Sequence, residues 1–544
     1  MKIRHILVLI LLTAKFSLFS QGIPVSLDNE ALYEFVDEMA ASHFIVVNQV
    51  VKPYSHQQVY KWLVEAESSY TKMTYRQREE WKFYKENILW QKEDTAKLEN
   101  RIDLFQRENG ALSLSPLGFY SRNETMSLAL KPILSAQFMN NSNGMIYHRS
   151  VGAAMELTIG NWGFYGNIQD YSEKENLARS SYLVNMTGGN YKGQDHSEMR
   201  GGVNYENDWV SVGLVKDFME WGTNQNGANI ISDRAPSFAQ IKLKISPVEW
   251  FEFNYVHGFL VSDVIDSTES YLLSNGDRRE VMHGKYIAAN MLTLYPFKTL
   301  GVSVGNSIVY SADNAKAQYL NPFMFYKSVD HTYNSTDGSG RNVGQNSQMY
   351  FDLSFRGIKN CFLYYTLFVD ELKMERWKNK DEHNFYSYKT GIKLTQLIPN
   401  TSFGIEYTHT TPITYQHDIT TTTFESNSYN MGHYLRDNAE EIYTYVNFRP
   451  VKNLRFKFSY TYVKKGEEYG YSRSSADVMH PFIEEVRYEN STWEFLSEYQ
   501  LAYDMFFNFR IGQSNTTGDD LETYVSPHYR GKQFNVMFGA NIGF

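Results

Sequence analysis

The sequence is short of cysteine, of basic residues and of long apolar runs, and each shortage excludes a class of protein. A single cysteine among 544 residues excludes a disulfide framework within the chain. Lysine and arginine total 52 against 61 acidic residues, a formal charge of −9, whereas nucleic acid binding needs clustered positive charge. A mean hydropathy of −0.46 excludes a membrane protein built from several spanning helices. The 41 Tyr, 35 Phe and 9 Trp are in turn too many for a disordered chain.

The first twenty residues are typical of a secretory signal peptide. Lys2 and Arg4 give a charged start, and an apolar segment over residues 6–13 follows. This segment is too short to span a bilayer, and we expect cleavage near Ser20. The one cysteine is Cys361, so we expect no lipid anchor near the cleavage site. The sequence therefore predicts an exported protein.

Residues 21–105 carry apolar side chains at helical spacing. Three runs are visible, and they comprise Leu32, Phe35, Val36 and Met39; Val59, Trp62 and Leu63; and Trp81, Tyr84 and Ile88. Pro53 and Ser55 stand just ahead of the second run, where a helix start is expected. We therefore predict three or more short helices that pack on one another as a domain without a chemical role.

From residue 106 onward the apolar period changes from about 3.6 to 2. Apolar and polar residues alternate without a fault over residues 454–462, and the last predicted strand keeps the pattern to Phe544. Repeated strands of roughly 10 residues with one apolar face are typical of a transmembrane β-barrel, because one face meets lipid while the backbone pairs with neighbouring strands. Strands in soluble sheets average about 5 to 6 residues. The sequence therefore predicts a barrel over residues 106–544.

The connections between the predicted strands alternate between short and long. Tight turns are expected near residues 160–161, 207–208, 247–249, 297–299, 357–360, 398–400, 450–453 and 502–504. Longer polar loops are expected near 139–149, 173–196, 218–237, 262–284, 312–346, 374–384, 413–438, 466–490 and 516–531. These turns and loops predict about 18 antiparallel strands, an even number that leaves both chain ends on one side. Residues 103–120 also look extended and are expected to form an extra hairpin.

A barrel of this size encloses a lumen that is either filled or open to solutes. The helical domain directly precedes the first strand, so we expect it in the periplasm, closing that mouth of the barrel. The predicted fold is thus an all-β transmembrane barrel with an N-terminal periplasmic helical bundle. A plugged or gated barrel is favoured over an open porin.

Several short segments resemble the Wzi family of outer-membrane capsule-assembly proteins. They are Leu32-Tyr-Glu-Phe-Val-Asp-Glu-Met-Ala40, Lys52-Pro-Tyr-Ser55, Thr74-Tyr-Arg-Gln77, Asn161-Trp-Gly-Phe-Tyr165, Trp221-Gly222, Ser232-Asp-Arg-Ala-Pro-Ser237 and Leu320-Asn-Pro-Phe323. The order of these segments along nearly the whole chain carries the resemblance. It implies an 18-stranded barrel with a periplasmic helical bundle. It also implies a role in attaching surface polysaccharide to the outer membrane through a lectin-like external face.

No set of residues supports catalysis, a cofactor or a metal. Gly301-Val-Ser303-Val-Gly305 matches the GxSxG nucleophile motif, but it alternates as a strand and no helix follows to complete the required turn. The 14 His are scattered, and none stands in an HExxH motif. We therefore predict that the protein is not an enzyme and has no catalytic residue, cofactor or metal ligand.

Two loops combine tryptophan with polar residues, which suits sugars because sugars present both C–H faces and hydroxyl groups. The candidate ligand-binding residues are Trp221, Asn224, Asp233 and Arg234 in the loop 218–237, and Arg376, Trp377 and Asp381 in the loop 374–384. Lysine and arginine in these loops would suit an anionic polymer. In the competing interpretation, the two tryptophans belong to the aromatic belt that anchors barrels at the lipid headgroups.

Three functions remain open on the sequence alone. The first is a barrel that attaches or organises capsular polysaccharide in the outer membrane of a diderm bacterium, with its long loops outside the cell. The others are a structural subunit of a multi-protein outer-membrane complex and a gated diffusion channel. Expected partners are outer-membrane lipid or lipopolysaccharide, surface polysaccharide and other outer-membrane proteins, and nucleic acid is not among them.

Overall fold

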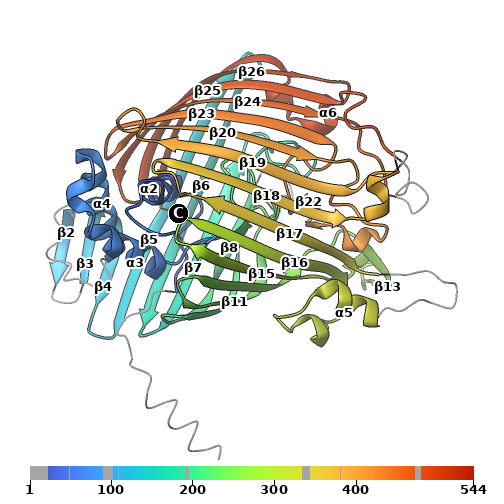
Figure 1. Ribbon diagram of the computed structural model, residues 1–544, viewed down its shortest axis with the longest axis horizontal. Coiled ribbons are helices and arrows are strands. Elements are labelled where there is room, and N and C mark those ends of the chain that lie inside the picture. The colour runs from blue at the N-terminus through green and yellow to red at the C-terminus, as the bar shows by residue number, and fades with distance from the viewer. Residues whose placement is uncertain are drawn as a thin grey trace, which may run out of the picture.

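The chain forms a closed antiparallel barrel of 18 strands, as the count of connections predicted (Figure 1). The computed structural model describes residues 22–47, 49–89, 102–107, 110–189, 195–333, 344–379, 382–471 and 479–543, and the predicted signal peptide lies outside them. The wall closes where β27 pairs with β5, with Val536 opposite Asn140. The strands are β5 (Met126–Asn141), β6 (Gly144–Ile159), β7 (Trp162–Glu173), β8 (Asp195–Glu206), β9 (Val210–Asp217), β11 (Phe238–Val248), β12 (Phe251–Leu260), β15 (Lys285–Phe297), β16 (Leu300–Ser311), β17 (Asn346–Phe355), β18 (Cys361–Glu371), β19 (Phe385–Thr395), β20 (Thr401–Thr410), β23 (Ala439–Val451), β24 (Leu454–Lys465), β25 (Tyr488–Ala502), β26 (Met505–Thr517) and β27 (Gly531–Ile542).

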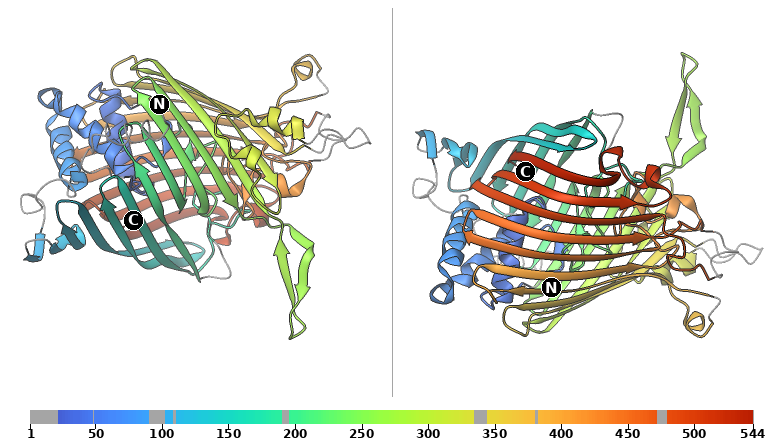
Figure 2. Two further views of the ribbon diagram at one scale, coloured as in Figure 1. Left: turned by 90° about the horizontal axis from the view of Figure 1, so that it is seen from below. Right: turned by 90° about the horizontal axis from the view of Figure 1, so that it is seen from above.

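Short turns and longer connections lie at opposite ends of the barrel (Figure 2). The eight predicted turns all fall at strand junctions, at the end where the helices pack, which we call the helical end. The opposite end is the loop end. The prediction of a loop near residues 139–149 is wrong, because β5 and β6 run on to Asn141 and Gly144 and leave a two-residue turn. The polar residues there belong to strand ends, and Asn141 Nδ2 donates to the carbonyl oxygen of His528 at 2.8 Å.

Three described helices precede the barrel, as predicted: α2 (Glu30–Ala41), α3 (His56–Glu67) and α4 (Tyr75–Leu89). Ser55 caps α3 by accepting a hydrogen bond from the Gln58 amide at 3.2 Å. The apolar residues expected to form a core do so, with Phe35 and Tyr84 fully buried. None of the described helices is both long and apolar enough to cross a membrane.

A short sheet links the helices to the barrel, as the extended segment 103–120 predicted. It consists of β2 (Ile102–Arg107), β3 (Gly110–Ser115) and β4 (Leu117–Arg122). Strand β4 pairs with the first half of one edge of β5, and β27 pairs with the second half of the same edge. The sheet therefore extends the wall at the helical end without interrupting closure.

The connections contain the remaining short elements. They are β1 (Val51–Lys52), η1 (Tyr70–Lys72), β10 (Glu220–Trp221), β13 (Ile265–Leu272), β14 (Arg278–Met282), η3 (Ala317–Tyr319), α5 (Tyr326–Tyr333), η4 (Met374–Trp377), η5 (Thr420–Thr422), β21 (Glu425–Ser426), β22 (Tyr429–Asn430), α6 (Leu521–Tyr524) and η6 (Pro527–Tyr529).

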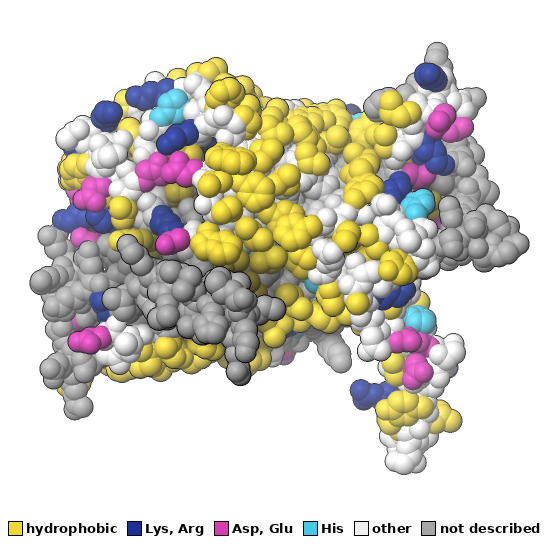
Figure 3. All heavy atoms as spheres, turned by 60° about the horizontal axis from the view of Figure 1, so that its bottom comes forward, with side chains coloured by type: hydrophobic (Ala, Val, Ile, Leu, Met, Phe, Trp, Pro, Cys, Tyr) yellow, Lys and Arg dark blue, Asp and Glu magenta, His cyan; other side chains and the backbone are white. Residues whose placement is uncertain are grey.

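Apolar side chains cover the middle of the outer wall, as contact with lipid requires (Figure 3). Val304 and Ile405 project outward from their strands and are 59% and 56% exposed. The adjacent Ser303 points toward the lumen, and its hydroxyl lies 2.9 Å from the hydroxyl of Thr293. Ser303 is the central residue of the GxSxG match, so that motif lies on strand β16 and does not form a nucleophile turn.

A charge introduced on the outer wall is expected to destabilise the barrel. Ile405→Arg places a guanidinium against lipid, and we expect it to lower the free energy of unfolding in vesicles by about 2–4 kcal/mol. Ile398→Arg is the matched control, because Ile398 is 57% exposed in a helical-end turn. Urea titration followed by tryptophan fluorescence measures both variants. Equal losses of stability would contradict a lipid-facing wall at β20.

Candidate functional site

Helix α2 has two faces of opposite chemistry and lies in the mouth of the barrel (Figure 1). Leu32 and Phe35 pack into the core that α2 shares with α3 and α4. Glu30, Glu34 and Asp37 follow one another at i+4 and i+3 spacing and therefore share a different face. Asn29 caps the helix by accepting the Leu32 amide at 3.2 Å. The helix thus presents carboxylates toward the barrel.

The acidic face of α2 meets a basic strip on the inner wall. Arg455 of β24 places Nη1 3.0 Å from Glu34 Oε2 and Nη2 3.2 Å from Glu30 Oε2. Lys393 of β19 places its Nζ 3.4 Å from Asp37 Oδ2. These pairs attach one side of α2 to the wall, while its apolar side holds α3 and α4 at the helical end. The basic strip comprises Arg356, Lys393, Arg455 and Lys457.

The ion pairs outweigh the cost of burying the carboxylates. Burial raises the pKa of Glu34, but attraction to Arg455 and Lys457 lowers it by a larger amount. The pKa of Glu34 therefore lies well below its ordinary value of 4.5. Burial likewise raises the pKa of Asp37, and Lys393 brings it below the ordinary 3.8. Both carboxylates are therefore ionised at neutral pH and attract the basic strip.

The loop 218–237, which we call the inward loop, folds into the lumen. Its strand β10 pairs with β1 of the N-terminal region, with Trp221 opposite Val51. Across this two-stranded sheet, Lys52 Nζ lies 2.7 Å from Glu220 Oε1. The amide of Gly222 donates to the carbonyl oxygen of Val50 at 3.1 Å. The N-terminal region and the inward loop therefore hold each other in place inside the barrel.

Buried carboxylates of the wall bind the backbone of the inward loop. Glu406 of β20 accepts the amides of Gln225 and Asn226 at 2.7 and 2.9 Å. Its charge is paired with Lys389, whose Nζ lies 2.5 Å from Oε1. Asp352 of β17 accepts the amide of Thr223, another residue of the inward loop, at 2.8 Å. A charge-assisted bond to a backbone amide is stronger than a neutral one, so these contacts define the path of the loop.

Trp221 lies at the centre of an apolar cluster inside the lumen. The residue is 2% exposed, and its ring meets that of Tyr350 edge-on at 6.3 Å. The same cluster includes Ile230 of the inward loop and Ile287 and Phe368 of the wall. It fills the part of the lumen bounded by β12 and β15–β18. Trp221 is therefore not an aromatic-belt residue, and ligand contact by its buried ring stays an untested prediction.

Another part of the lumen holds a cavity of about 640 Å³, which we call the lumen chamber. Helix α2 bounds one side of it, and the inward loop together with residues 185–189 bounds the other. Its remaining walls come from β6–β8 and β23–β26. The side chains that could contact a polar ligand there include Tyr171, His196, Glu198, Asn224, Gln225, Asn226, Asp233, Tyr443, Ser459 and Thr461.

The chamber is acidic. Its lining has nine carboxylates against four lysine and arginine side chains. Burial, with Glu220 and Asp28 close by, raises the pKa of Asp233 to about 7. An anionic polymer is therefore disfavoured inside the chamber, whereas a neutral or amine-bearing ligand is not.

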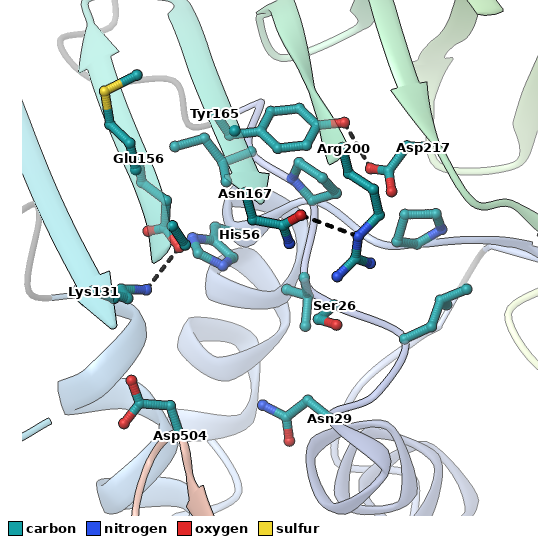
Figure 4. A pocket seen from close by; sticks show the side chains of 18 of the residues that line it. Ser26, Asn29, His56, Lys131, Glu156, Tyr165, Asn167, Arg200, Asp217 and Asp504 are labelled. Atoms are coloured by element: carbon teal, nitrogen blue, oxygen red, sulfur yellow. Dashed lines mark hydrogen bonds and ion pairs between the residues drawn. The ribbon is translucent and has the colours of Figure 1, made fainter. Parts of the chain in front are cut away.

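A smaller cavity of about 80 Å³ lies between the N-terminal segment and the wall (Figure 4). Lys131 Nζ lies 2.7 Å from Glu156 Oε1, and the hydroxyl of Tyr165 donates to Asp217 Oδ2 at 2.6 Å. Arg200 borders both this cavity and the lumen chamber. The cavity is small compared with ligand sites, which measure about 300–1,000 Å³. We interpret it as part of the junction between wall and helices.

The structure brings together part of the predicted ligand-binding set. Asn224 and Asp233 both line the lumen chamber. Arg234 is buried, and its guanidinium donates to the carbonyl oxygens of Met186 and Tyr182 at 2.6 and 2.5 Å. It therefore joins the inward loop to the neighbouring connection between β7 and β8.

The second predicted group lies at the loop end in the connection between β18 and β19. Arg376 is buried in η4 and pairs with Glu371 at 3.4 Å and with Glu382 at 3.7 Å. The side chain of Trp377 and the whole of Asp381 lie outside the described residues. Ligand contact by all seven residues stays a prediction.

The ion pairs of α2 and the role of Glu406 are not among the residues predicted from the sequence, although the sequence carries a signal for each. Arg455 and Lys457 occupy the lumen-facing positions of the alternating segment 454–462. Glu406 likewise alternates with the lipid-facing residues of β20. Charges at inward positions of several strands indicate a lumen filled by other parts of the chain, because such charges need partners there.

Comparison with known proteins identifies a fold and no sequence family. No family model and no curated protein matches the chain. Among solved structures, Wzi of Escherichia coli, described as an outer-membrane protein involved in group 1 capsule assembly and a carbohydrate-binding β-barrel, matches with a TM-score of 0.59. The match covers 96% of this chain and 100% of that one at 11% identity. The chain has a Wzi-like barrel fold.

The resemblance inferred from the sequence is thus confirmed as a likeness of fold, that of an outer-membrane barrel. Two other solved structures share less with this Wzi-like chain. OprD of Pseudomonas aeruginosa matches 76% of this chain and 92% of its own at 12% identity, with a TM-score of 0.41. OccAB4 of Acinetobacter baumannii matches 76% and 97% at 8% identity, with a TM-score of 0.43.

Removing one guanidinium of the basic strip is expected to release α2. Arg455→Ala leaves Glu30 and Glu34 without their main partner, and breaking a buried ion pair in this way costs about 3–5 kcal/mol. We expect the amides of α2 to exchange with deuterium roughly a hundredfold or more faster, as mass spectrometry would measure. Arg149→Ala is the control, because Arg149 is exposed on β6. Unchanged exchange of α2 in the Arg455 variant would contradict the electrostatic attachment.

Acid is expected to weaken the same attachment. Because the pKa values of Glu34 and Asp37 are lowered in the folded chain, their contribution is present above the ordinary values of 4.5 and 3.8 and is lost as the pH falls through the folded values. We expect single barrels in planar bilayers to conduct little at pH 7 and to open more and more often as the pH is lowered below these ordinary values. In the double variant Glu34→Gln/Asp37→Asn, openings should already occur at pH 7. Glu67→Gln on the surface of α3 is the control, and openings in that variant at pH 7 would contradict the assignment.

Proposed function

We propose that this protein is a non-catalytic outer-membrane barrel that binds surface polysaccharide and holds it at the outer membrane. The observation that carries the proposal is the lumen chamber, whose size and lining suit a saccharide. The Wzi-like fold supports it, because Wzi is described as a carbohydrate-binding barrel. A fold by itself does not determine function, so the chemistry of the chamber is the main argument.

The chamber has the two kinds of group that sugars require. Tyr171 and Tyr443 contribute aromatic rings on which the C–H face of a sugar packs. Asn224 and Asp233 contribute an amide and a carboxyl group for its hydroxyls. A volume of about 640 Å³ falls within the range of about 300–1,000 Å³ that is typical of ligand sites.

The charge of the chamber indicates which chemical class of sugar it can bind. With nine carboxylates against four cationic side chains, a neutral or amine-bearing sugar is favoured over a uronic acid. An anionic section of a polymer would instead contact the loop end near Trp377, where Lys378 is exposed, because Arg376 is buried and already paired with Glu371 and Glu382. Trp221 and Arg234 then act indirectly, by holding the inward loop that forms one side of the chamber.

We further propose that the helical end faces the periplasm and the loop end faces the outside of the cell. Outer-membrane barrels carry short turns on the periplasmic side and longer loops on the external side. The turns of this chain lie with the helices, and the longer connections lie at the opposite end. The predicted signal peptide is consistent with export.

A diffusion channel is disfavoured by the contents of the lumen. Helix α2 occupies one mouth, and the inward loop with its apolar cluster occupies the part bounded by β12 and β15–β18. The alternative that the barrel is a subunit of a larger complex is tested by the purification described next.

Purification from native outer membranes in mild detergent is expected to yield the barrel with bound saccharide. Mass spectrometry for proteins and a carbohydrate assay would be applied to the same sample. A stoichiometric protein partner without carbohydrate would overturn the proposal and make the barrel a subunit of an envelope complex.

Two variant pairs locate the ligand. Thr461→Trp fills the chamber from β24 and should abolish bound saccharide, whereas Tyr460→Trp, one residue away on the outer face, should retain it. Trp377→Ala at the loop end is compared with Trp250→Ala, an exposed tryptophan in a helical-end turn. If only Trp377→Ala loses the bound saccharide, the protein still binds polysaccharide, but it binds it at the loop end and not in the chamber.

A further inference from the structure

The connection between β16 and β17 folds back over the outside of the barrel. We call residues 312–333, which include η3 and α5, the outer flap. Figure 1 shows α5 beside β16, outside the ring of strands, and Figure 2 shows the same arrangement from below. The flap covers β12, β15 and β16, three neighbouring strands of the wall.

The wall under the flap is polar where lipid-facing residues are expected. Asn306 stands two residues from the lipid-facing Val304 on β16 and therefore points outward, and Asn290 is its partner on β15. His257 on β12 also lies on this outer face and is fully buried, with Nε2 2.9 Å from the hydroxyl of Tyr310. A wall with these groups bare would expose unsatisfied polar atoms to hydrocarbon, at several kcal/mol each.

The backbone of the flap satisfies the two asparagines, Asn290 and Asn306. Asn290 Nδ2 donates to the carbonyl oxygens of Pro322 and Met324 at 2.8 and 2.9 Å. Asn306 Oδ1 accepts the amide of Tyr326 at 2.8 Å. The hydrogen-bonding groups of the flap and of the wall are therefore complementary, and the flap is an integral part of the barrel structure.

Aromatic packing holds the flap down. Tyr319 and Tyr326 are fully buried against the wall. The ring of Phe323 stacks on that of Phe253, with centroids 4.7 Å apart. The hydroxyl of Tyr255 on β12 donates to the carbonyl oxygen of Tyr319 at 3.2 Å.

The surface that the flap turns outward is again apolar. Four of its side chains, Leu320, Phe323, Met324 and Phe325, are between 37% and 65% exposed. Residues 317–326 carry no charge, while Lys316 and Lys327 flank them. Single exposed apolar residues are common on any protein, but four within six residues form a patch that needs a partner.

We propose that the outer flap is a lipid-binding part of the wall, whose exposed apolar side chains contact the acyl chains of the surrounding membrane. The patch continues the lipid-facing surface of the wall, since Val304 lies on the covered strand β16 two residues from Asn306. The flap encloses the polar residues of three strands and presents a new apolar surface in their place. Lysines at both ends of the uncharged segment suit the phosphates at the membrane surface. This inference does not depend on the proposed polysaccharide role.

Site-directed spin labelling in lipid vesicles tests the inference. The single Cys361 is buried and is replaced by alanine to give a cysteine-free chain. Nitroxide labels are then placed at Leu320→Cys and Phe325→Cys, which avoids Phe323 because its ring packs on the wall. Val304→Cys serves as the lipid reference, and Glu249→Cys in a helical-end turn serves as the water reference. The vesicles consist of phosphatidylethanolamine and phosphatidylglycerol, and heat-modified mobility in gels confirms that each variant is folded.

Collision of the label with oxygen and with a nickel chelate separates the possible surroundings. For both flap labels, we expect the ratio of oxygen collisions to nickel collisions to lie within about twofold of the ratio measured at position 304. Nickel access equal to that at position 249 would overturn the inference by placing the flap in water. Low access to both reagents would also overturn it, because the patch would then be covered by protein. Either flap position suffices for the test if the other variant does not fold.

Discussion

The rest of the structure depends on charge pairing between the acidic face of α2 and the basic strip of the barrel wall. Within the lumen, a guanidinium such as Arg455 or a carboxylate such as Glu34 is costly to bury alone, so each requires the other. The pairing positions α2 in the mouth of the barrel. It thereby forms one side of the lumen chamber and brings β1 to the place where it pairs with the inward loop.

The lumen is divided by the composition of its wall. Strands β12 and β15–β18 turn apolar residues such as Ile287 and Phe368 inward, and the inward loop packs Trp221 against them. Strands β6–β8 and β23–β26 turn tyrosines, carboxylates and hydroxyls inward, and that part of the lumen holds the chamber. One loop therefore separates a packed apolar cluster from a hollow polar region, because Glu406 and Lys389 hold its backbone between the two.

The same strands that are apolar toward the lumen are partly polar toward the outside. On β15, Ile287 faces the inner cluster while Asn290 faces the outer flap. Both faces of this wall are buried by other parts of the chain, the inward loop on one side and the flap on the other. The usual rule of apolar outside and polar inside holds where lipid and water are the partners, and it fails where protein covers both faces.

The sequence by itself determined the strand period, the number of strands and the three helices, because these follow from local alternation and spacing, as in residues 454–462 and around Leu32. It also contained the inward positions of Arg455 and Lys457. The tertiary structure alone decided which connections fold inward or outward, since a polar loop such as 218–237 has the same composition whether it meets water or Glu406. It likewise decided that Trp221 is buried, and that Asn224 and Asp233 share a chamber with Tyr171 and Tyr443, since such contacts join residues that are dozens to hundreds of positions apart in the chain.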